Sequence, residues 1–161
     1  MRLDVPMDIA APREVVWDVL VRWEDQSDWM KDAKSVEVVS DHREGEGVTI
    51  HVPTNLMGFT TLDVMEVTEW VEHERLAVEH LGRIITGTGV FELDDHPDEP
   101  GLMRLHWREH VDPPLGALGE WGANTFVKPF TRWLFRRSLR NLAMACEREA
   151  AQRRHGADLT G

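Results

Sequence analysis

The chain has 161 residues, the length of one ordinary domain, and its 42% hydrophobic and 29% charged residues exclude disorder of the whole chain. The net charge of −11 repels a phosphate backbone and therefore argues against nucleic acid as a general partner. Cys146, the single cysteine, cannot form an internal disulfide, which agrees with a reducing compartment.

The N-terminal segment has the wrong composition for export. Asp4, Asp8 and Glu14 interrupt the stretch in which a signal peptide needs continuous apolar residues. The sequence also contains no run of about 18 apolar residues, the length that a transmembrane helix requires. We therefore expect a cytoplasmic protein without an integral membrane segment.

The first elements expected along the chain are a strand and two short helices. Residues 3–9 alternate apolar and polar side chains with the two-residue period of a strand that buries one face, and Pro6 indicates an edge or a bulge. Apolar residues then recur at helical spacing up to about Arg22, with Pro12 in the first turn of this helix. Residues 28–30 predict one further helical turn.

Six strands are expected next, separated by turns and loops. Alternating patterns and turn residues place them at residues 36–38, 48–52, 60–70, 76–80, 84–94 and 103–111. Gly87 and Gly89 in the interior of one strand indicate a bend or the close approach of another element. Strands joined by short connections pair antiparallel, because parallel pairing needs a long crossover.

A long amphipathic helix is predicted at the C-terminal end. Apolar side chains recur on neighbouring turns from about residue 121 to residue 153, with arginines opposite them. Pro129 either kinks this helix or lies in its first turn, so the start of the helix stays open. The helix has no helical partner, so it can bury its apolar stripe only on the sheet. We interpret its arginines as a solvated face rather than a site for an anionic partner.

Several motifs occur in a shared order along the chain. They are Ile9-Ala10-Ala11-Pro12, residues 15–20 (VVWDVL), Asp28-Trp29-Met30, Gly45-Glu46-Gly47, residues 87–93 (GTGVFEL), Leu105-His106-Trp107 and residues 137–142 (RSLRNL). With these motifs nearly the whole chain resembles the polyketide cyclase/dehydrase and lipid-transport branch of the Bet v 1-like superfamily, also called START-like or SRPBCC proteins.

The order of elements and this resemblance predict an α+β helix-grip fold. Its parts are a curved seven-stranded antiparallel sheet around a long C-terminal helix, with two short helices after the first strand. We expect one such domain over residues 1–154 and a flexible tail at residues 155–161.

The resemblance also implies a cavity between the concave face of the sheet and the long helix. Members of this superfamily bind lipids, sterols, polyketides or plant hormones, and some cyclise or dehydrate polyketides. Because one fold hosts many functions, the resemblance leaves both the ligand and any reaction open.

Large apolar side chains are the candidate walls of this cavity, since a ligand pocket needs an apolar lining with few polar groups. The candidates are Trp29, Met57, Phe91, Trp107, Phe126 and Phe130. Ordinary core packing is the alternative for each of them.

Two polar residues are candidates for the site itself. Glu109 shares a strand face with Trp107 and Val111, so a concave face would bury its carboxylate, as in a general acid or a ligand anchor. The alternative is a strand end in contact with water, or an ion pair with an arginine of the long helix. His80 shares an apolar face and is a candidate base or hydrogen-bond donor, with a satisfied core histidine as the alternative. Asn124 is a further candidate polar contact.

The sequence carries no metal or cofactor motif. His106 and His110 have a spacing that suits zinc on a helix, but on a strand they lie about 13 Å apart, too far to share a metal. No G-x-S-x-G, phosphate-binding glycine loop or C-x-x-C occurs, and we predict neither metal nor cofactor. Tyrosine is absent, which removes the phenolic hydroxyls that would polarise a polyketide carbonyl.

Three functions follow from these observations. The leading hypothesis is a non-catalytic protein that binds or transports an apolar or amphipathic small molecule, such as a lipid or a polyketide-like compound. The first alternative is a polyketide cyclase or dehydratase with Glu109 or His80 as acid or base, and a meeting of the two side chains would favour it. The second is a protein-interaction module that uses the basic helix face or exposed tryptophans. A homodimer stays open.

Overall fold

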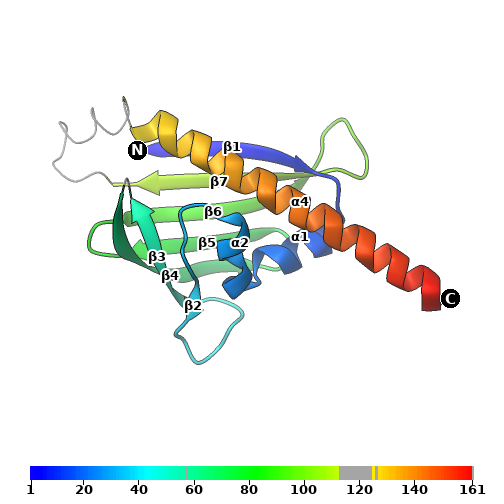
Figure 1. Ribbon diagram of the computed structural model, residues 1–161, viewed down its shortest axis with the longest axis horizontal. Coiled ribbons are helices and arrows are strands. Elements are labelled where there is room, and N and C mark those ends of the chain that lie inside the picture. Colours follow the sequence, from blue (N-terminus) through cyan, green and yellow to red (C-terminus); the bar gives the residue numbers. More distant parts are fainter. Residues whose placement is uncertain (57, 113–124, 126, 161) are drawn as a thin grey trace.

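The structure, a computed structural model, describes residues 1–56, 58–112, 125 and 127–160. Seven antiparallel strands form one sheet. They are β1 (Arg2–Ile9), β2 (Glu37–Val38), β3 (Thr49–Leu56), β4 (Phe59–Val71), β5 (Arg75–Leu81), β6 (Thr86–Asp95) and β7 (Met103–Val111). Their order in the sheet is β1-β7-β6-β5-β4-β3-β2, so β1 closes one edge beside the last strand (Figure 1).

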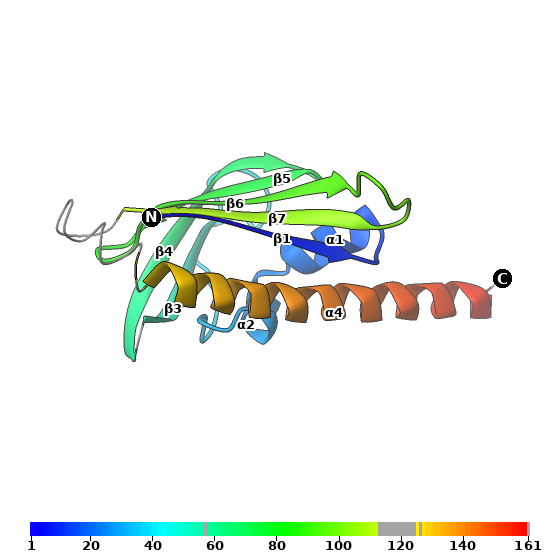
Figure 2. The same ribbon diagram turned by 90° about the horizontal axis from the view of Figure 1, so that it is seen from above.

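The helices are α1 (Arg13–Leu20), α2 (Gln26–Trp29) and the long α4 (Lys128–Thr160), with a 3₁₀ turn at Trp23–Asp25. The sheet curls, and α4 lies across its concave side together with α1 and α2 (Figure 2). The predicted order of strand, two short helices, six strands and long helix is confirmed, and with it the helix-grip fold. Within the described residues, no helix is long and apolar enough to span a bilayer.

The close approach predicted at the glycines of β6 occurs where β6 pairs with β7. Gly87 has φ +134, and a Cβ atom built on it would lie 1.9 Å from the carbonyl oxygen of His110. Both the backbone angle and the space therefore require glycine at this position. This contact brings the β6 and β7 backbones together beside the polar residues described below.

The buried stripe of α4 holds the helix against the rest of the chain. It consists of side chains three or four positions apart: Phe135, Leu139, Leu142, Cys146 and Ala150. This stripe faces β1 and α1. Each fully buried leucine contributes roughly 1.5–3 kcal/mol by removing apolar surface from water.

The structure defines both ends of α4, whose start the sequence leaves open. Pro129 is the second residue of the helix, so it lies in the first turn, where its missing N–H leaves no intrahelical bond unmade. The helix continues to Thr160, past the residue 153 that the pattern indicates. Residues 154–159 are all exposed, and the domain boundary at residue 154 stays a prediction.

Two hydrogen bonds fasten the segment after α2 to α4. The backbone N–H of Lys31 donates to Oγ of Ser138 over 3.0 Å, and Nδ2 of Asn141 donates to the backbone carbonyl of Trp29 over 3.3 Å. Ser138 is fully buried, so its bond is shielded from water. The segment that begins at Met30 is therefore held beside the helix, opposite the sheet.

Candidate functional site

A pocket of about 470 Å³ lies between the concave face of the sheet and the first turns of α4. Its walls are mostly aliphatic and aromatic, and include Leu76, Val78, Phe91 and Trp107 from the sheet and Leu134 and Phe135 from α4. Pockets of about 300–1,000 Å³ with apolar walls are typical of sites for small organic molecules.

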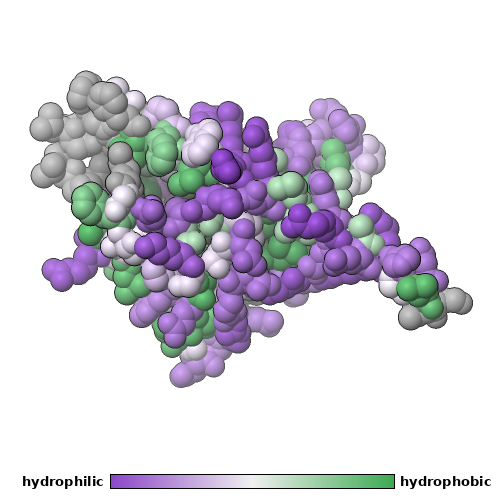
Figure 3. Space-filling model, in the orientation of Figure 1, coloured by the Kyte–Doolittle hydropathy of each residue, from purple (hydrophilic) through white to green (hydrophobic). Residues whose placement is uncertain are grey.

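Exposed apolar side chains lie at the rim of this pocket, beside the exposed polar residues Asn55 and Asp112. Ile84, between β5 and β6, and Phe130, in the first turn of α4, line the pocket and are 56% and 48% exposed. On the face shown in Figure 3, hydrophobic residues gather toward the end of the molecule where α4 begins, while the rest of α4 is mostly hydrophilic. An apolar guest therefore meets exposed apolar side chains before it is enclosed.

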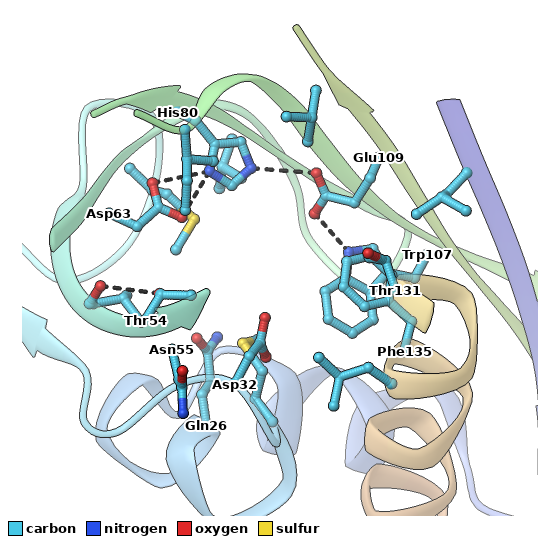
Figure 4. Close-up of a pocket in the computed structure, with 18 of the residues that line it drawn as sticks. Gln26, Asp32, Thr54, Asn55, Asp63, His80, Trp107, Glu109, Thr131 and Phe135 are labelled. Carbon is cyan, nitrogen blue, oxygen red and sulfur yellow. Dashed lines mark hydrogen bonds and ion pairs between the residues drawn. The ribbon is translucent and has the colours of Figure 1, made fainter. Parts of the chain in front are cut away.

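Three side chains from different strands meet in the wall of the pocket and form the Asp63–His80–Glu109 network (Figure 4). Nδ1 of His80 lies 2.9 Å from Oδ2 and 3.0 Å from Oδ1 of Asp63, and Nε2 lies 3.3 Å from Oε2 of Glu109. Each of the three side chains is only 6–7% exposed. The two ring nitrogens of one imidazole thus connect two buried carboxylates.

A glycine allows His80 on β5 to meet Glu109 on β7, although β6 lies between these strands. Gly89 pairs with Val78 on one side and with Glu109 on the other. A Cβ atom built on Gly89 would lie 2.8 Å from Oε1 of Glu109 and 3.2 Å from Cγ2 of Val78. The missing side chain at Gly89 therefore leaves the space that the Glu109 carboxylate occupies.

Trp107 connects this network to α4. Its indole Nε1 donates to Oε1 of Glu109 over 2.8 Å. Its ring stacks on Phe135 of α4, with 3.8 Å between ring centroids and 7° between planes. The carboxylate of Glu109 therefore accepts one bond on each oxygen, and the stacked pair fixes its position relative to the helix.

His80 is charged at neutral pH. Burial alone lowers the pKa of an imidazole, but the hydrogen bonds and negative charges of Asp63 and Glu109 outweigh burial and raise the pKa of His80 to about 10. The imidazolium then donates one N–H to each carboxylate. One cation stands between two carboxylates, so the network as a whole is negative.

Asp32 projects into the pocket from the side opposite the sheet (Figure 4). Burial, opposed in part by backbone hydrogen bonds and reinforced by the negative charges of Glu109 and Asp63, raises the pKa of Asp32 above its usual value. Its Oδ1 atom is buried and has no hydrogen-bond partner among the described residues. Buried acceptors are nearly always paired in folded proteins, so this oxygen is an open hydrogen-bonding position.

The structure places the residues proposed from sequence as follows. His80, Phe91, Trp107, Glu109 and Phe130 all line the pocket. Trp29 is buried behind them, with its ring centroid 6.3 Å from those of both Phe91 and Trp107, and does not line the pocket. Met57, Asn124 and Phe126 lie outside the described residues.

Sequence reasoning missed two carboxylates. Asp63 lies on the same face of its strand as Met65 and Val67, and an acid among apolar residues of one face is a signal that was available. Asp32 lies in the irregular segment between α2 and β2, where no periodicity indicates which way a side chain points.

Metal ligation has no support in the described part of the chain, where no group of three or more His, Cys, Asp or Glu side chains could hold an ion. His106 and His110 both lie on β7, and each has its own acidic neighbour. His106 contacts Asp4 over 3.0 Å, and His110 contacts Asp112 over 3.3 Å.

Comparisons with known proteins agree with this fold. A family model described as polyketide cyclase / dehydrase and lipid transport matches residues 1–147. Similar solved structures include TTHA0849 from Thermus thermophilus, with 18% identity, a TM-score of 0.75 and coverage of 91% of this chain and 97% of that chain. A START superfamily protein from Mycobacterium smegmatis has 16% identity, a TM-score of 0.64 and coverage of 94% and 97%.

XoxI from Bacillus cereus is a further similar structure, with 14% identity, a TM-score of 0.65 and coverage of 89% of this chain and 94% of that chain. At such identities the likeness shows the fold alone. No curated protein matches the sequence.

Proposed function

We propose that this chain, which belongs to the polyketide cyclase / dehydrase and lipid transport family, binds an apolar or amphipathic small molecule in the pocket and does not transform it. The observation that carries the proposal is the pocket of about 470 Å³ with mostly apolar walls and with exposed apolar side chains at its rim. Every 100 Å² of apolar ligand surface removed from water contributes roughly 2.5 kcal/mol to binding, before the cost of immobilising the ligand.

The bonding of the polar network favours binding over catalysis. A general base needs a free lone pair near the proton that it removes. Both ring nitrogens of His80 contact carboxylates, and its pKa of about 10 keeps it protonated at neutral pH. Both oxygens of Glu109 already accept hydrogen bonds, from Trp107 and His80. The hydrogen bonds of the network therefore hold its three side chains, and the charge of His80, in fixed positions.

A cyclase or dehydratase is the second candidate, and the meeting of His80 and Glu109 in one pocket favours it. Such an enzyme must remove a proton beside a carbonyl group. His80 can do so only after it loses a proton and one of its present partners, whereas each carboxylate oxygen of Glu109 keeps a second lone pair. If the protein turns over a polyketide-like substrate, Glu109→Gln and His80→Ala are expected to abolish the activity. Turnover that survives both changes would remove these two residues from the mechanism.

Ligand capture tests the leading proposal directly. Native mass spectrometry of protein purified from its own host is expected to show a co-purifying small molecule, and the neutral dye Nile red is expected to fluoresce in the emptied pocket. Val78→Trp places an indole in the pocket and is expected to prevent dye uptake. Val71→Trp makes the same change at a 40% exposed position and is expected to leave uptake intact.

Two results would contradict the proposal. Repeated purification without a bound molecule, together with no dye uptake by folded wild-type protein, would show that the pocket is not a binding site. Equal uptake by wild-type protein and Val78→Trp would place the dye elsewhere on the surface.

A further inference from the structure

The charged side chains at the pocket are almost all acidic. The ionisable side chains that line it are Asp32, Asp63, His80, Glu109 and Asp112. No lysine or arginine lines the pocket in the described part of the chain, and residues 113–124, outside that part, contain neither. The N-terminal ammonium group of Met1, another lining residue, donates to the backbone carbonyl of Val111 over 2.6 Å.

The cation inside the pocket wall is not available to a ligand. His80 directs one N–H to Asp63 and the other to Glu109, at 2.9 Å and 3.3 Å. A carboxylate or phosphate that entered would lose its hydration next to several carboxylates, and neither His80 nor any lysine or arginine among the described lining residues could pair with it. The acidic lining of the pocket therefore disfavours anionic ligands.

The open hydrogen-bonding position is an acceptor. Oδ1 of Asp32 is buried without a partner among the described residues, and Figure 4 shows this side chain reaching toward the space below Glu109. The electrostatic influence of Asp63 and Glu109 on Asp32 means that all three carboxyl groups act on the same space. A donor placed there gains a hydrogen bond and relieves repulsion among the acids.

Building on the proposed function, we infer that the pocket takes an apolar molecule whose polar end is a hydrogen-bond donor, and that it prefers an organic amine to a carboxylate. Asp32 accepts the hydrogen bond of this polar end, and the Asp63–His80–Glu109 network supplies the negative field. The hydrocarbon part of the ligand contacts the apolar walls formed by Val78, Phe91 and Leu134.

Three probes with the same chain test this inference: dodecylamine, dodecanol and dodecanoate, each titrated below its micelle concentration at pH 7 with displacement of Nile red as the readout. Dodecylamine is expected to bind about tenfold to 100-fold more tightly than dodecanoate, the range that one charge-assisted hydrogen bond supplies. Dodecanol, a neutral donor, is expected to lie between them.

Two matched variants separate Asp32 from the overall charge of the protein. Asp32→Asn is expected to reduce the preference for dodecylamine over dodecanoate by at least about threefold, with the field of the network unchanged. The variant is expected to keep dodecanol binding, which also shows that it is folded. Asp41→Asn removes the same charge from an exposed residue that does not line the pocket, and it is expected to keep the wild-type preference.

The outcomes distinguish this inference from the proposed function. If folded protein takes up neither Nile red nor any of the three probes, the proposed function fails and the inference fails with it. If Nile red binds but none of the three probes displaces it, the inference fails while the proposed function stands. If dodecanoate binds as tightly as dodecylamine, the inference is overturned while the proposed function stands. A wild-type preference that persists in Asp32→Asn would overturn the assignment of Asp32.

Discussion

Replacing His80 with glutamine tests the charge of the Asp63–His80–Glu109 network through the stability of the fold. The wild-type protein holds an imidazolium between two carboxylates, and His80→Gln leaves the carboxylates with a neutral amide. Because folding raises the pKa of His80 from 6.5 to about 10, the native state binds more protons than the unfolded chain between these values. The stability from this charge is therefore fully present below pH 6.5 and is lost as the pH rises through 10.

The size of the effect follows from the two pKa values. The difference between 6.5 and about 10, at about 1.4 kcal/mol per pKa unit, corresponds to about 5 kcal/mol of unfolding free energy. Of this, about 4 kcal/mol is lost between pH 6 and pH 10. The His80 side chain is 7% exposed, so solvent screens its interactions little. The variant His80→Gln has no titrating side chain at position 80, so its unfolding free energy does not show this loss between pH 6 and pH 10.

Urea unfolding at intervals between pH 6 and pH 10 measures both proteins. The wild-type protein is expected to be several kcal/mol more stable than His80→Gln at pH 6, and the difference is expected to narrow by about 4 kcal/mol by pH 10. Groups remote from His80 that titrate in this range are common to both proteins and cancel. His155→Gln, at an exposed position, serves as the control and is expected to follow the wild-type profile. A constant difference between wild type and His80→Gln would refute the charged network.

Three further outcomes are expected. Leu139→Ala removes a fully buried side chain of α4 and is expected to cost about 2–5 kcal/mol in urea melts, whereas Leu159→Ala, at a 75% exposed position, costs less than about 0.5 kcal/mol. Gly87→Ala is expected to prevent folding because its Cβ would overlap a carbonyl oxygen, while Gly101→Ala, with φ +90 in open space, costs about 1–3 kcal/mol in thermal melts. Burial raises the pKa of the Cys146 thiol to about 12, so a thiol reagent is expected to label folded protein far more slowly than unfolded protein, and equal rates would contradict this burial.

Strand alternation predicts which face of a strand a residue occupies, but not which residues of other strands it contacts. Alternation places Glu109 on the inner face of β7 and His80 on the apolar face of β5, and both line the pocket. It does not indicate that the two side chains touch, because β6 lies between their strands. Their contact depends on the missing side chain at Gly89, whose place in the strand interior already suggested the close approach of another element.

The order and type of the elements, and through them the helix-grip architecture, are determined by the sequence itself. This holds because the periods of two and about 3.6 residues depend on local backbone geometry, and because short connections force antiparallel pairing. Only the tertiary structure decides which polar groups share the pocket. Asp32 lies in an irregular segment without periodicity, and hydrogen bonds to α4 place that segment opposite the sheet. The charge on His80 likewise depends on Asp63 and Glu109, which come from distant parts of the chain and meet only when the sheet curls.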